Sequence, residues 1–241
     1  MTDTLKFPSF NVYKKNEIDN PLIHYLHLGK NAGTQIGNII DQVNNLYNNK
    51  VIHKYGHEKI LVDLPFQSKY FFSIRDPISR FISGFYSRKR KGQPRIYVEW
   101  TKHEKFAFEN FKDANDLAEN LYEKGSNGDK AIQAILSIRH TARNQVDWFV
   151  RAGGFLELQP PIYIVRVEHF EEDILAFLDK SGFGQLKSKI TISKDIKIAH
   201  SNNYSEVPAL SDKAKNNLKN WYQQDILFYE MCENWIKTNN N

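Results

Sequence analysis

The segment 27–35, with the sequence HLGKNAGTQ, contains residue types that bind an anionic group. Its small residues let backbone N–H groups approach a ligand, and the helix expected to begin there adds the positive end of its dipole. Lys30 supplies a full charge and Thr34 supplies a hydroxyl. The segment predicts a cradle for a phosphate-like group, and an ordinary strand-to-helix turn capped by Thr34 is the alternative interpretation.

The order of residues in this segment differs from that of a nucleoside triphosphate loop. Such a loop reads G-x-x-x-x-G-K-[ST], with the lysine after the second glycine. Here Lys30 precedes Gly33, and the glycine required further upstream is missing. The pattern therefore disfavours an ordinary ATPase or GTPase.

A second segment, 75–83, has the sequence RDPISRFIS and is suited to a phosphate dianion. Arg75 follows an apolar stretch and offers a planar fork of N–H donors. Ser83 lies two turns into the helix expected to follow, so its hydroxyl can donate to a group bound along that face. A helix that begins at Asp76 and Pro77 would give the same pattern without a ligand, and this alternative stays open for the segment taken alone.

Together, the two segments resemble motifs of the sulfotransferases that use 3′-phosphoadenosine 5′-phosphosulfate (PAPS). The segment 27–35 is similar to their 5′-phosphosulfate loop, which in the Golgi carbohydrate branch often reads H-x-P-K-T-A-G-T. Gly29 and Asn31 stand here for the usual proline and threonine. The segment 75–83 is similar to their 3′-phosphate motif, R-D-P-x-x-R-x-x-S. The two motifs occur in the family's order, and each follows an expected strand.

The resemblance implies PAPS as the donor and phosphoadenosine phosphate (PAP) as the product. An acceptor hydroxyl would attack sulfur in line, and Lys30 would stabilise the negative charge on the leaving phosphate. The sulfuryl group carries less charge than a phosphoryl group, so we expect no metal. The implied donor-binding residues are Lys30, Asn31, Ala32, Gly33, Thr34 and Gln35 for the 5′ end, with Arg75 and Ser83 for the 3′-phosphate.

Removal of the acceptor's proton needs a general base, and a histidine is suited to that role. The pair Gly56-His57 is similar to a stretch of the heparan sulfate 2-O-sulfotransferase branch that carries a catalytic histidine. The resemblance therefore implies His57 as the base. His53, Glu58 and His140 are the alternatives.

The acceptor side of the site is expected to involve the middle of the chain. Gln145 lies where the resembled enzymes often carry a substrate-side glutamine, and His140 is close to two arginines. By analogy the acceptor is a hydroxyl-bearing saccharide, and no nucleic acid is expected as a partner. The predicted acceptor-side residues are Arg88, Arg139, His140, Arg143 and Gln145.

The charge of the chain favours an anionic partner, with a net charge of +5 and a pI of about 9.0. The basic run 88–91, followed by Arg95, is either a solvated helix end or a patch that attracts an acidic substrate or nucleic acid. Two other functions therefore stay open. These are a non-catalytic binder of anionic glycans or nucleic acid, and a kinase-like phosphotransferase.

Strand and helix patterns alternate along the chain. This alternation predicts an α/β fold with a parallel sheet covered on both faces by helices, and the resemblance implies a P-loop sheet like that of nucleotide kinases. We expect strands at 22–28, 70–74 and 162–167, with a further one near 196–199. We expect helices at 34–46, 78–88 and 170–178, and a helical end at 211–236. The middle segment, 106–150, is expected to be largely helical, with breaks at 125–128 and near His140.

The length of 241 residues suits a single domain, 1–241. The one cysteine, Cys232, excludes an internal disulfide framework. No apolar run approaches the ~20 residues that span a bilayer, so we expect no integral membrane segment. The start of the chain lacks the pattern of a secretory signal, which favours a cytoplasmic location unless a longer precursor carries an anchor. The sequence does not indicate the oligomeric state.

Overall fold

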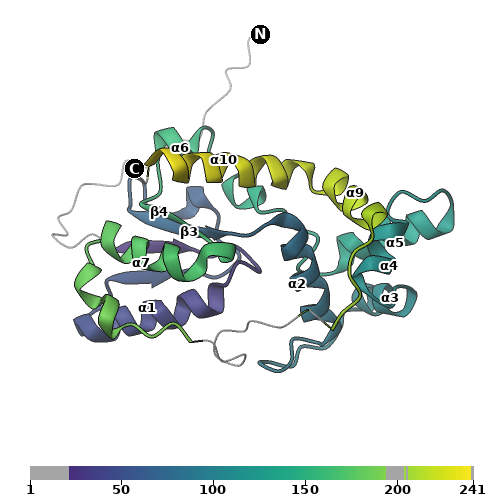
Figure 1. The fold of residues 1–241 in the computed structure, drawn as a ribbon, viewed down its shortest axis with the longest axis horizontal. Coiled ribbons are helices and arrows are strands. Elements are labelled where there is room, and N and C mark those ends of the chain that lie inside the picture. Colours follow the sequence, from purple (N-terminus) through teal and green to yellow (C-terminus); the bar gives the residue numbers. More distant parts are fainter. Residues whose placement is uncertain (1–21, 194–203, 205, 240–241) are drawn as a thin grey trace, which may run out of the picture.

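A four-stranded sheet forms the centre of the computed structural model, which describes residues 22–193, 204 and 206–239 (Figure 1). All neighbouring strands are parallel, in the order β2-β1-β3-β4. This architecture confirms the predicted α/β class with a parallel sheet. The strands are β1 (Ile23–Leu26), β2 (Ile52–Lys54), β3 (Tyr70–Ile74) and β4 (Tyr163–Arg166).

The strand β3 illustrates why these segments pair inside the molecule. Every residue of its sequence YFFSI is buried, as expected for a parallel strand that is covered on both faces. Successive side chains point to opposite faces, so Tyr70 and Phe72 pack in one core and Phe71 packs in the other. The sheet therefore separates two hydrophobic layers.

Helices cover both faces of the sheet (Figure 1). On one face, α1 (Gly33–Tyr47) and α7 (Phe170–Lys180) pack their apolar sides against β1, β3 and β4. On the other face lie α10 (Gln223–Asn239), α6 (Phe155–Leu158) and the short 3₁₀ helix η2 (Val146–Phe149). Three further 3₁₀ turns are η1 (Leu61–Asp63), η3 (Val167–His169) and η4 (Gly184–Lys189).

A group of helices extends the molecule beyond one end of the sheet, and this confirms the largely helical middle segment. Figure 1 shows these helices together at the right. They share one hydrophobic core that includes Phe81, Phe85, Leu117, Ile135 and Leu218. The helices are α2 (Pro77–Lys89), α3 (Lys102–Asn110), α4 (Ala114–Asn120), α5 (Ser126–Ser137) and α9 (Asp212–Trp221).

The strand order creates a crevice at one edge of the sheet. From β1 the chain passes through α1 to β2 on one side, whereas β3 is followed along the chain by β4 on the other side. In open α/β sheets, ligands bind where the strand order reverses in this way, outside the carboxyl ends of the strands. The segments 27–35 and 75–83 follow β1 and β3, so both begin at this crevice.

The basic run 88–91 is distributed among structural contacts rather than gathered in a free patch. Arg88 and Lys89 occupy the last turn of α2, as the helix-end interpretation predicts. The buried Arg88 guanidinium donates to both oxygens of Glu104, at 2.6 and 2.7 Å, and Lys91 pairs with Glu99. The structure therefore corrects the expectation that Arg88 meets an acceptor, because its donors are already used inside the protein.

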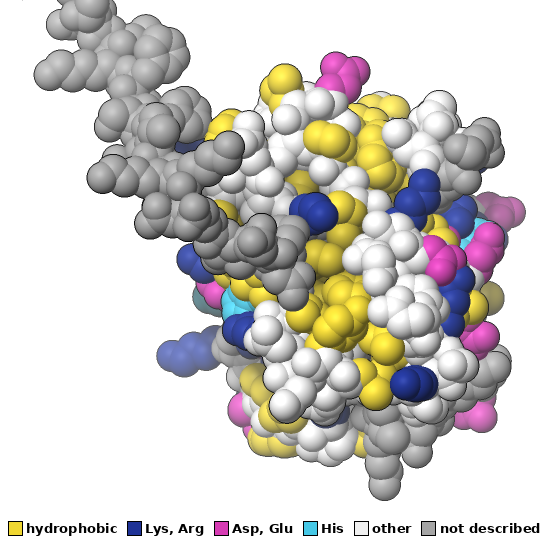
Figure 2. All heavy atoms as spheres, turned by 90° about the vertical axis from the view of Figure 1, so that its left-hand side faces the viewer, with side chains coloured by type: hydrophobic (Ala, Val, Ile, Leu, Met, Phe, Trp, Pro, Cys, Tyr) yellow, Lys and Arg dark blue, Asp and Glu magenta, His cyan; other side chains and the backbone are white. Residues whose placement is uncertain are grey.

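On the face that Figure 2 shows, Lys and Arg side chains are dispersed around a band of hydrophobic side chains. No continuous basic stripe crosses the visible, described part of this face. Among the described residues, no helix is long and apolar enough to cross a membrane.

Three element predictions differ from the structure. The helical end is divided into α9 and α10 at Tyr222, because this buried residue leaves helical geometry and donates its hydroxyl to the Thr141 carbonyl at 2.8 Å. The short strand β2 was not predicted, since three residues give too little pattern. Gly128 lies inside α5, so only Gly125 marks the break there. The strand expected near 196–199 lies outside the described residues.

Candidate active site

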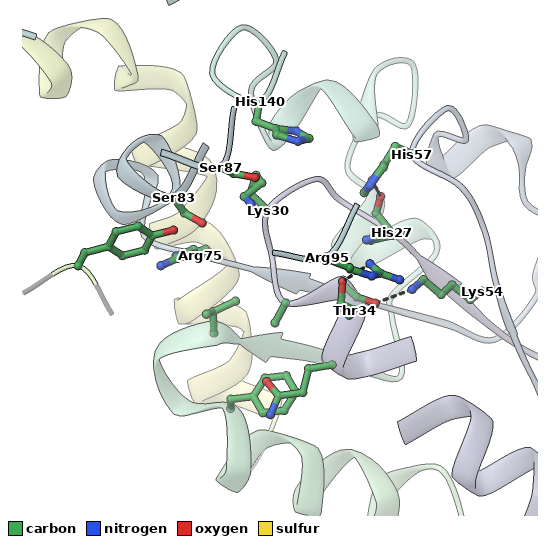
Figure 3. Close-up of a pocket in the computed structure, with 16 residues that line it drawn as sticks. His27, Lys30, Thr34, Lys54, His57, Arg75, Ser83, Ser87, Arg95 and His140 are labelled. Atoms are coloured by element: carbon green, nitrogen blue, oxygen red, sulfur yellow. Dashed lines mark hydrogen bonds between the residues drawn. The ribbon is translucent and has the colours of Figure 1, made fainter. Parts of the chain in front are cut away.

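A pocket of about 360 Å³ opens at the carboxyl ends of β1 and β3, and both predicted segments line it (Figure 3). In Figure 3, Arg75 and Ser83 lie on one side, His27, His57 and Lys54 on the other. None of its described lining residues is Asp or Glu. The cationic side chains that line it are Lys30, Lys54, Arg75 and Arg95, and the histidines are His27, His57 and His140.

The first segment presents its backbone to this pocket. The backbone of Lys30 and Ala32 adopts the left-handed conformation, with φ angles of 69° and 57°. Residues other than glycine rarely adopt this strained conformation, and those that do are concentrated at functional sites. Ala32 is the N-cap of α1, and no side chain caps the helix. The N–H groups of the first turn, beginning at Gly33, are therefore available to an anion.

Gly33 is needed because the His27 ring lies directly against it. A Cβ atom at Gly33 would be 1.7 Å from His27 Nε2. Burial and the neighbouring His57 lower the pKa of His27 to about 2, so this imidazole is neutral. Lys54 donates to the Gly33 carbonyl and so brings a second cation to the start of α1.

Lys30 projects into the middle of the pocket (Figure 3). Burial, followed by the charges of Arg75 and Arg90, lowers its pKa from 10.5 to about 7. Within the described part of the chain, the ammonium group has no hydrogen-bond or ion-pair partner. An anion bound beside it would supply that partner and stabilise its charged form.

The second segment supplies a guanidinium and a hydroxyl. Arg75 lines the pocket together with the buried Ser83 of α2. The Arg75 Nε atom is buried and has no hydrogen-bond partner among the described residues. Asp76 also caps α2, because its Oδ1 accepts from Ser79 N at 2.7 Å and Pro77 occupies the first turn. The capping interpretation is thus correct, and it is compatible with a binding role for Arg75.

Gln145 is fully buried and joins the two segments instead of facing an acceptor. Its Oε1 accepts from Asn31 Nδ2 at 2.7 Å and from Arg75 N at 2.9 Å. Its Nε2 donates to the Arg75 carbonyl at 2.8 Å. This corrects the substrate-side assignment of Gln145, which has no exposed atom for a substrate to reach. Asn31 is likewise fully buried and is not among the residues that line the pocket, so the structure corrects its assignment as a donor-binding residue.

Arg80 and Asp225 complete this support, and they were not predicted as site residues. Arg80 Nε donates to the Gly29 carbonyl at 2.9 Å, and its Nη1 lies 3.8 Å from Asp225. Asp225 accepts from the backbone of Gln145 at 2.6 Å. The second arginine of R-D-P-x-x-R was the available signal for Arg80, whereas nothing local marks Asp225.

His57 is held at the mouth of the pocket by its neighbours. Its ring lies tilted against that of His27, with 3.8 Å between the ring centroids, and its Nδ1 lies 3.1 Å from the His27 carbonyl. A carbonyl only accepts, so Nδ1 carries the proton. Nε2 of the neutral ring is then an acceptor, and it has no hydrogen-bond partner among the described residues. Partial removal from water lowers the pKa of His57, although the hydrogen bond to His27 acts in the opposite direction.

The remaining predicted acceptor-side residues have different positions. His140 lines the pocket, whereas Arg139 is exposed outside it. Arg143 stacks on the Trp148 ring, 3.6 Å from its centroid, and both donate to the His57 carbonyl, at 2.9 and 3.1 Å. Arg143 therefore positions the His57 segment.

Several lining residues were not predicted from the sequence. Ser87 lies one helical turn after Ser83, and this spacing was an available signal. His27 begins the first predicted segment, so its position in that segment was also an available signal. The other residues reach the pocket only through the tertiary structure, and these are Lys54, Arg95, Val167, Phe170 and Tyr204.

A parallel sheet flanked by helices, with an uncapped helix start and the Arg75 guanidinium at its switch point, is compatible with a P-loop-like fold. Comparison with protein families identifies the group: the model of the sulfotransferase family matches residues 18–231, and the chain belongs to this family. The protein is therefore a transferase that uses a sulfonate donor of the PAPS type. No curated protein sequence matches the chain significantly.

The residues present fit such a donor. The uncapped start of α1 and the buried, unpartnered Arg75 Nε need anionic partners, and PAPS carries anionic groups at both its 5′ and 3′ positions. Among the described residues, no group of three or more His, Cys, Asp or Glu side chains is arranged to hold a metal ion.

Proposed function

We propose that the protein transfers the sulfuryl group of PAPS to a hydroxyl of a saccharide. The observation that carries the proposal is the pocket at the switch point, which has an uncapped helix start on one side and Arg75 on the other. Two separate anion-binding regions in one pocket suit a donor with phosphates at both ends.

In this proposal the first segment binds the 5′ end of the donor. Lys30 and the backbone N–H groups of 32–35 surround the 5′-phosphate. Arg75 and Ser83 bind the 3′-phosphate and so fix the donor's orientation. Val167, Phe170 and Tyr204 also line the pocket and supply the apolar and aromatic surface on which a nucleobase packs.

His57 acts as the general base. Its Nε2 accepts the proton of the attacking hydroxyl, while Nδ1 stays bonded to the His27 carbonyl. Bound PAPS supplies the sulfuryl group, whose bond to the 5′-phosphate breaks as the acceptor oxygen bonds to sulfur. Lys30 stabilises the negative charge that remains on the phosphate, an effect worth about 3–4 kcal/mol for a preorganised donor.

A saccharide acceptor is supported by the resemblance of both motifs to carbohydrate sulfotransferases and by the open, cationic mouth beside His57 and Lys54. The kinase alternative lacks a triphosphate loop. The non-catalytic alternative is weakened by the distribution of the run 88–91 among structural contacts.

The direct test is transfer of radiolabelled sulfuryl from PAPS to a panel of desulfated polysaccharides, with phenols and tyrosyl peptides as other acceptor classes. We expect label only on a polysaccharide. Labelling of a phenol or peptide alone would overturn the saccharide proposal.

Donor binding is tested separately by calorimetry with PAP. Arg75→Ala should weaken PAP binding at least tenfold, because a charge-assisted pair is lost. The control is Arg151→Ala, which removes an exposed arginine outside the pocket. Equal affinities in the two variants would refute the 3′-phosphate assignment.

A further inference from the structure

Arg95 reaches the start of α1 from a distant part of the chain. It lies in the loop that joins α2 to α3, and its Nη1 donates to Thr34 Oγ1 at 2.8 Å. Figure 3 shows its guanidinium between Thr34 and Lys54, on the side of the pocket that holds His27. No local sequence pattern predicts this position.

The loop that carries this arginine has a defined backbone. Gly92 N donates to the Ser87 carbonyl at 2.9 Å, and Val98 N donates to the Lys91 carbonyl at 2.7 Å. The buried Arg88 also donates to the Val98 carbonyl. Gly92 takes a left-handed conformation with φ 82°, which glycine adopts without strain. These contacts tie the loop to the end of α2 and fix the direction of the arginine at its tip.

The charges around Arg95 favour a bound anion. Its guanidinium has no carboxylate partner among the described residues, yet it lies close enough to Lys54 and His27 for its charge to lower the pKa of both. Burial is the larger cause in each case. Asp41 offsets part of the charge at Lys54, but two neighbouring cations are still stabilised when an anion binds between them.

The position of Arg95 places it near the sulfuryl group of the donor rather than near the 3′-phosphate. The 5′-phosphate is assigned to Lys30 and the first turn of α1, and the proton acceptor is His57 Nε2. The reacting sulfur must lie between the 5′-phosphate and His57 Nε2. Arg95 lies on the side of Thr34 that faces His27 and His57 (Figure 3). A planar guanidinium can donate to two oxygens of one sulfuryl group.

We propose that Arg95 is a further catalytic residue, which binds the sulfuryl oxygens of PAPS and holds the group in line for transfer. This rests on the proposed function. As the acceptor oxygen bonds to sulfur, the bond from sulfur to the 5′-phosphate breaks and its electron pair stays on PAP. The acceptor's proton passes to His57. Arg95 remains charged and forms no covalent bond.

The test compares the binding of PAPS with that of PAP, which lacks the sulfuryl group, by calorimetry. Arg95→Ala should weaken PAPS binding about tenfold or more, as expected for a lost charge-assisted pair, and should leave PAP affinity within twofold. Arg95→Lys keeps the charge but not the fork, so its PAPS affinity should be intermediate. Arg151→Ala is the matched control and should bind both ligands like the unchanged protein.

The outcomes separate this proposal from the proposed function. If Arg95→Ala loses affinity for PAP and PAPS equally, Arg95 contacts the 5′-phosphate and the sulfuryl assignment is wrong. Unchanged affinity for both also overturns it. If the unchanged protein binds neither ligand, the proposed function itself fails. Because Arg95 is exposed, retained PAP binding in the variant also reports that the pocket is intact.

Discussion

At the scale of single residues, the charge state of Lys30 is linked to donor binding. The ammonium is buried among arginines, and its pKa is about 7 without a ligand. An anion beside it restores the charged form. We therefore expect binding of the donor to take up a proton at pH values above the ligand-free pKa.

We expect PAP binding at pH 8 to take up close to one proton, and PAP affinity to fall as the pH rises from 7.5 to 9. The limiting slope is about tenfold per pH unit for one group. Calorimetry in buffers of different ionisation enthalpy measures the uptake. Lys30→Gln should abolish it, and an unchanged uptake in this variant would assign the proton to another group.

The lowered pKa of Lys30 makes donor affinity fall as the pH rises, but it makes the stability of the ligand-free fold rise with pH. The unfolded chain keeps its Lys30 proton up to about pH 10.4, whereas the folded chain releases it above pH 7. Since the unfolded state binds more protons in this window, this group makes stability rise with pH between about 7 and 10.4.

A second prediction at this scale concerns His57. Replacement His57→Ala should leave PAP affinity within twofold and lower single-turnover transfer about 10²–10⁴-fold, the usual contribution of a general base. His103→Ala, which removes an exposed histidine of α3, serves as the control. Full activity of His57→Ala would move the role to His53, Glu58 or His140, and loss of PAP affinity would indicate a structural role.

At the scale of elements, the start of α1 requires glycine at position 33, because the His27 ring occupies the space that a side chain there would need. In Gly33→Ala the new Cβ would overlap His27 Nε2, so the ring must move away from the helix. We expect a loss of about 1–3 kcal/mol in the free energy of unfolding and at least tenfold weaker PAP binding. Denaturant unfolding and calorimetry measure the two effects.

The matched control is Gly154→Ala, where an added Cβ meets no atom within 4 Å and φ is −74°. This variant should keep its stability and its PAP affinity. Adding His27→Ala to Gly33→Ala should restore part of the lost stability. If Gly33→Ala is as stable as Gly154→Ala, the contact with His27 does not constrain the helix start.

Much of the element order could be predicted from the sequence, because long apolar strands and amphipathic helices carry their own periodicity. β3 was predicted with its observed bounds. Both motif segments were also placed correctly, since each begins where a parallel strand ends and such ends meet at one edge of a sheet.

The rest depends on contacts between distant segments. Gln145 bonds to Asn31 across 114 positions of the chain, so no local pattern separates its structural role from a substrate-side one. Lys54 reaches the pocket because the three-residue β2 pairs with β1, and Arg95 reaches it through the path of an irregular loop. Arg88 was misassigned because a run of basic residues does not reveal that one of them is paired inside the core.

At the scale of the whole molecule, donor binding should stabilise the fold without added metal. PAP at about 100 times its Kd should add about 2.7 kcal/mol to the free energy of unfolding and raise Tm. The shift should persist in EDTA and shrink at high salt, because the pocket's attraction for the ligand is electrostatic.

Thermal unfolding with PAP and EDTA measures this effect, and ADP with magnesium is the comparison ligand. A shift that appears only with magnesium, or a larger shift with ADP, would favour the kinase alternative. No shift at millimolar PAP would contradict the donor site as a whole.

The cations that line the pocket also bear on how long each molecule persists. Folding brings Lys30, Lys54, Arg75 and Arg95 together, whereas the unfolded chain separates them in water, so their repulsion favours opening. A bound donor removes this repulsion and lowers the population of opened, protease-sensitive chains. We therefore expect resistance to proteolysis to rise with donor concentration, so that the supply of the donor affects the lifetime of the enzyme as well as its rate.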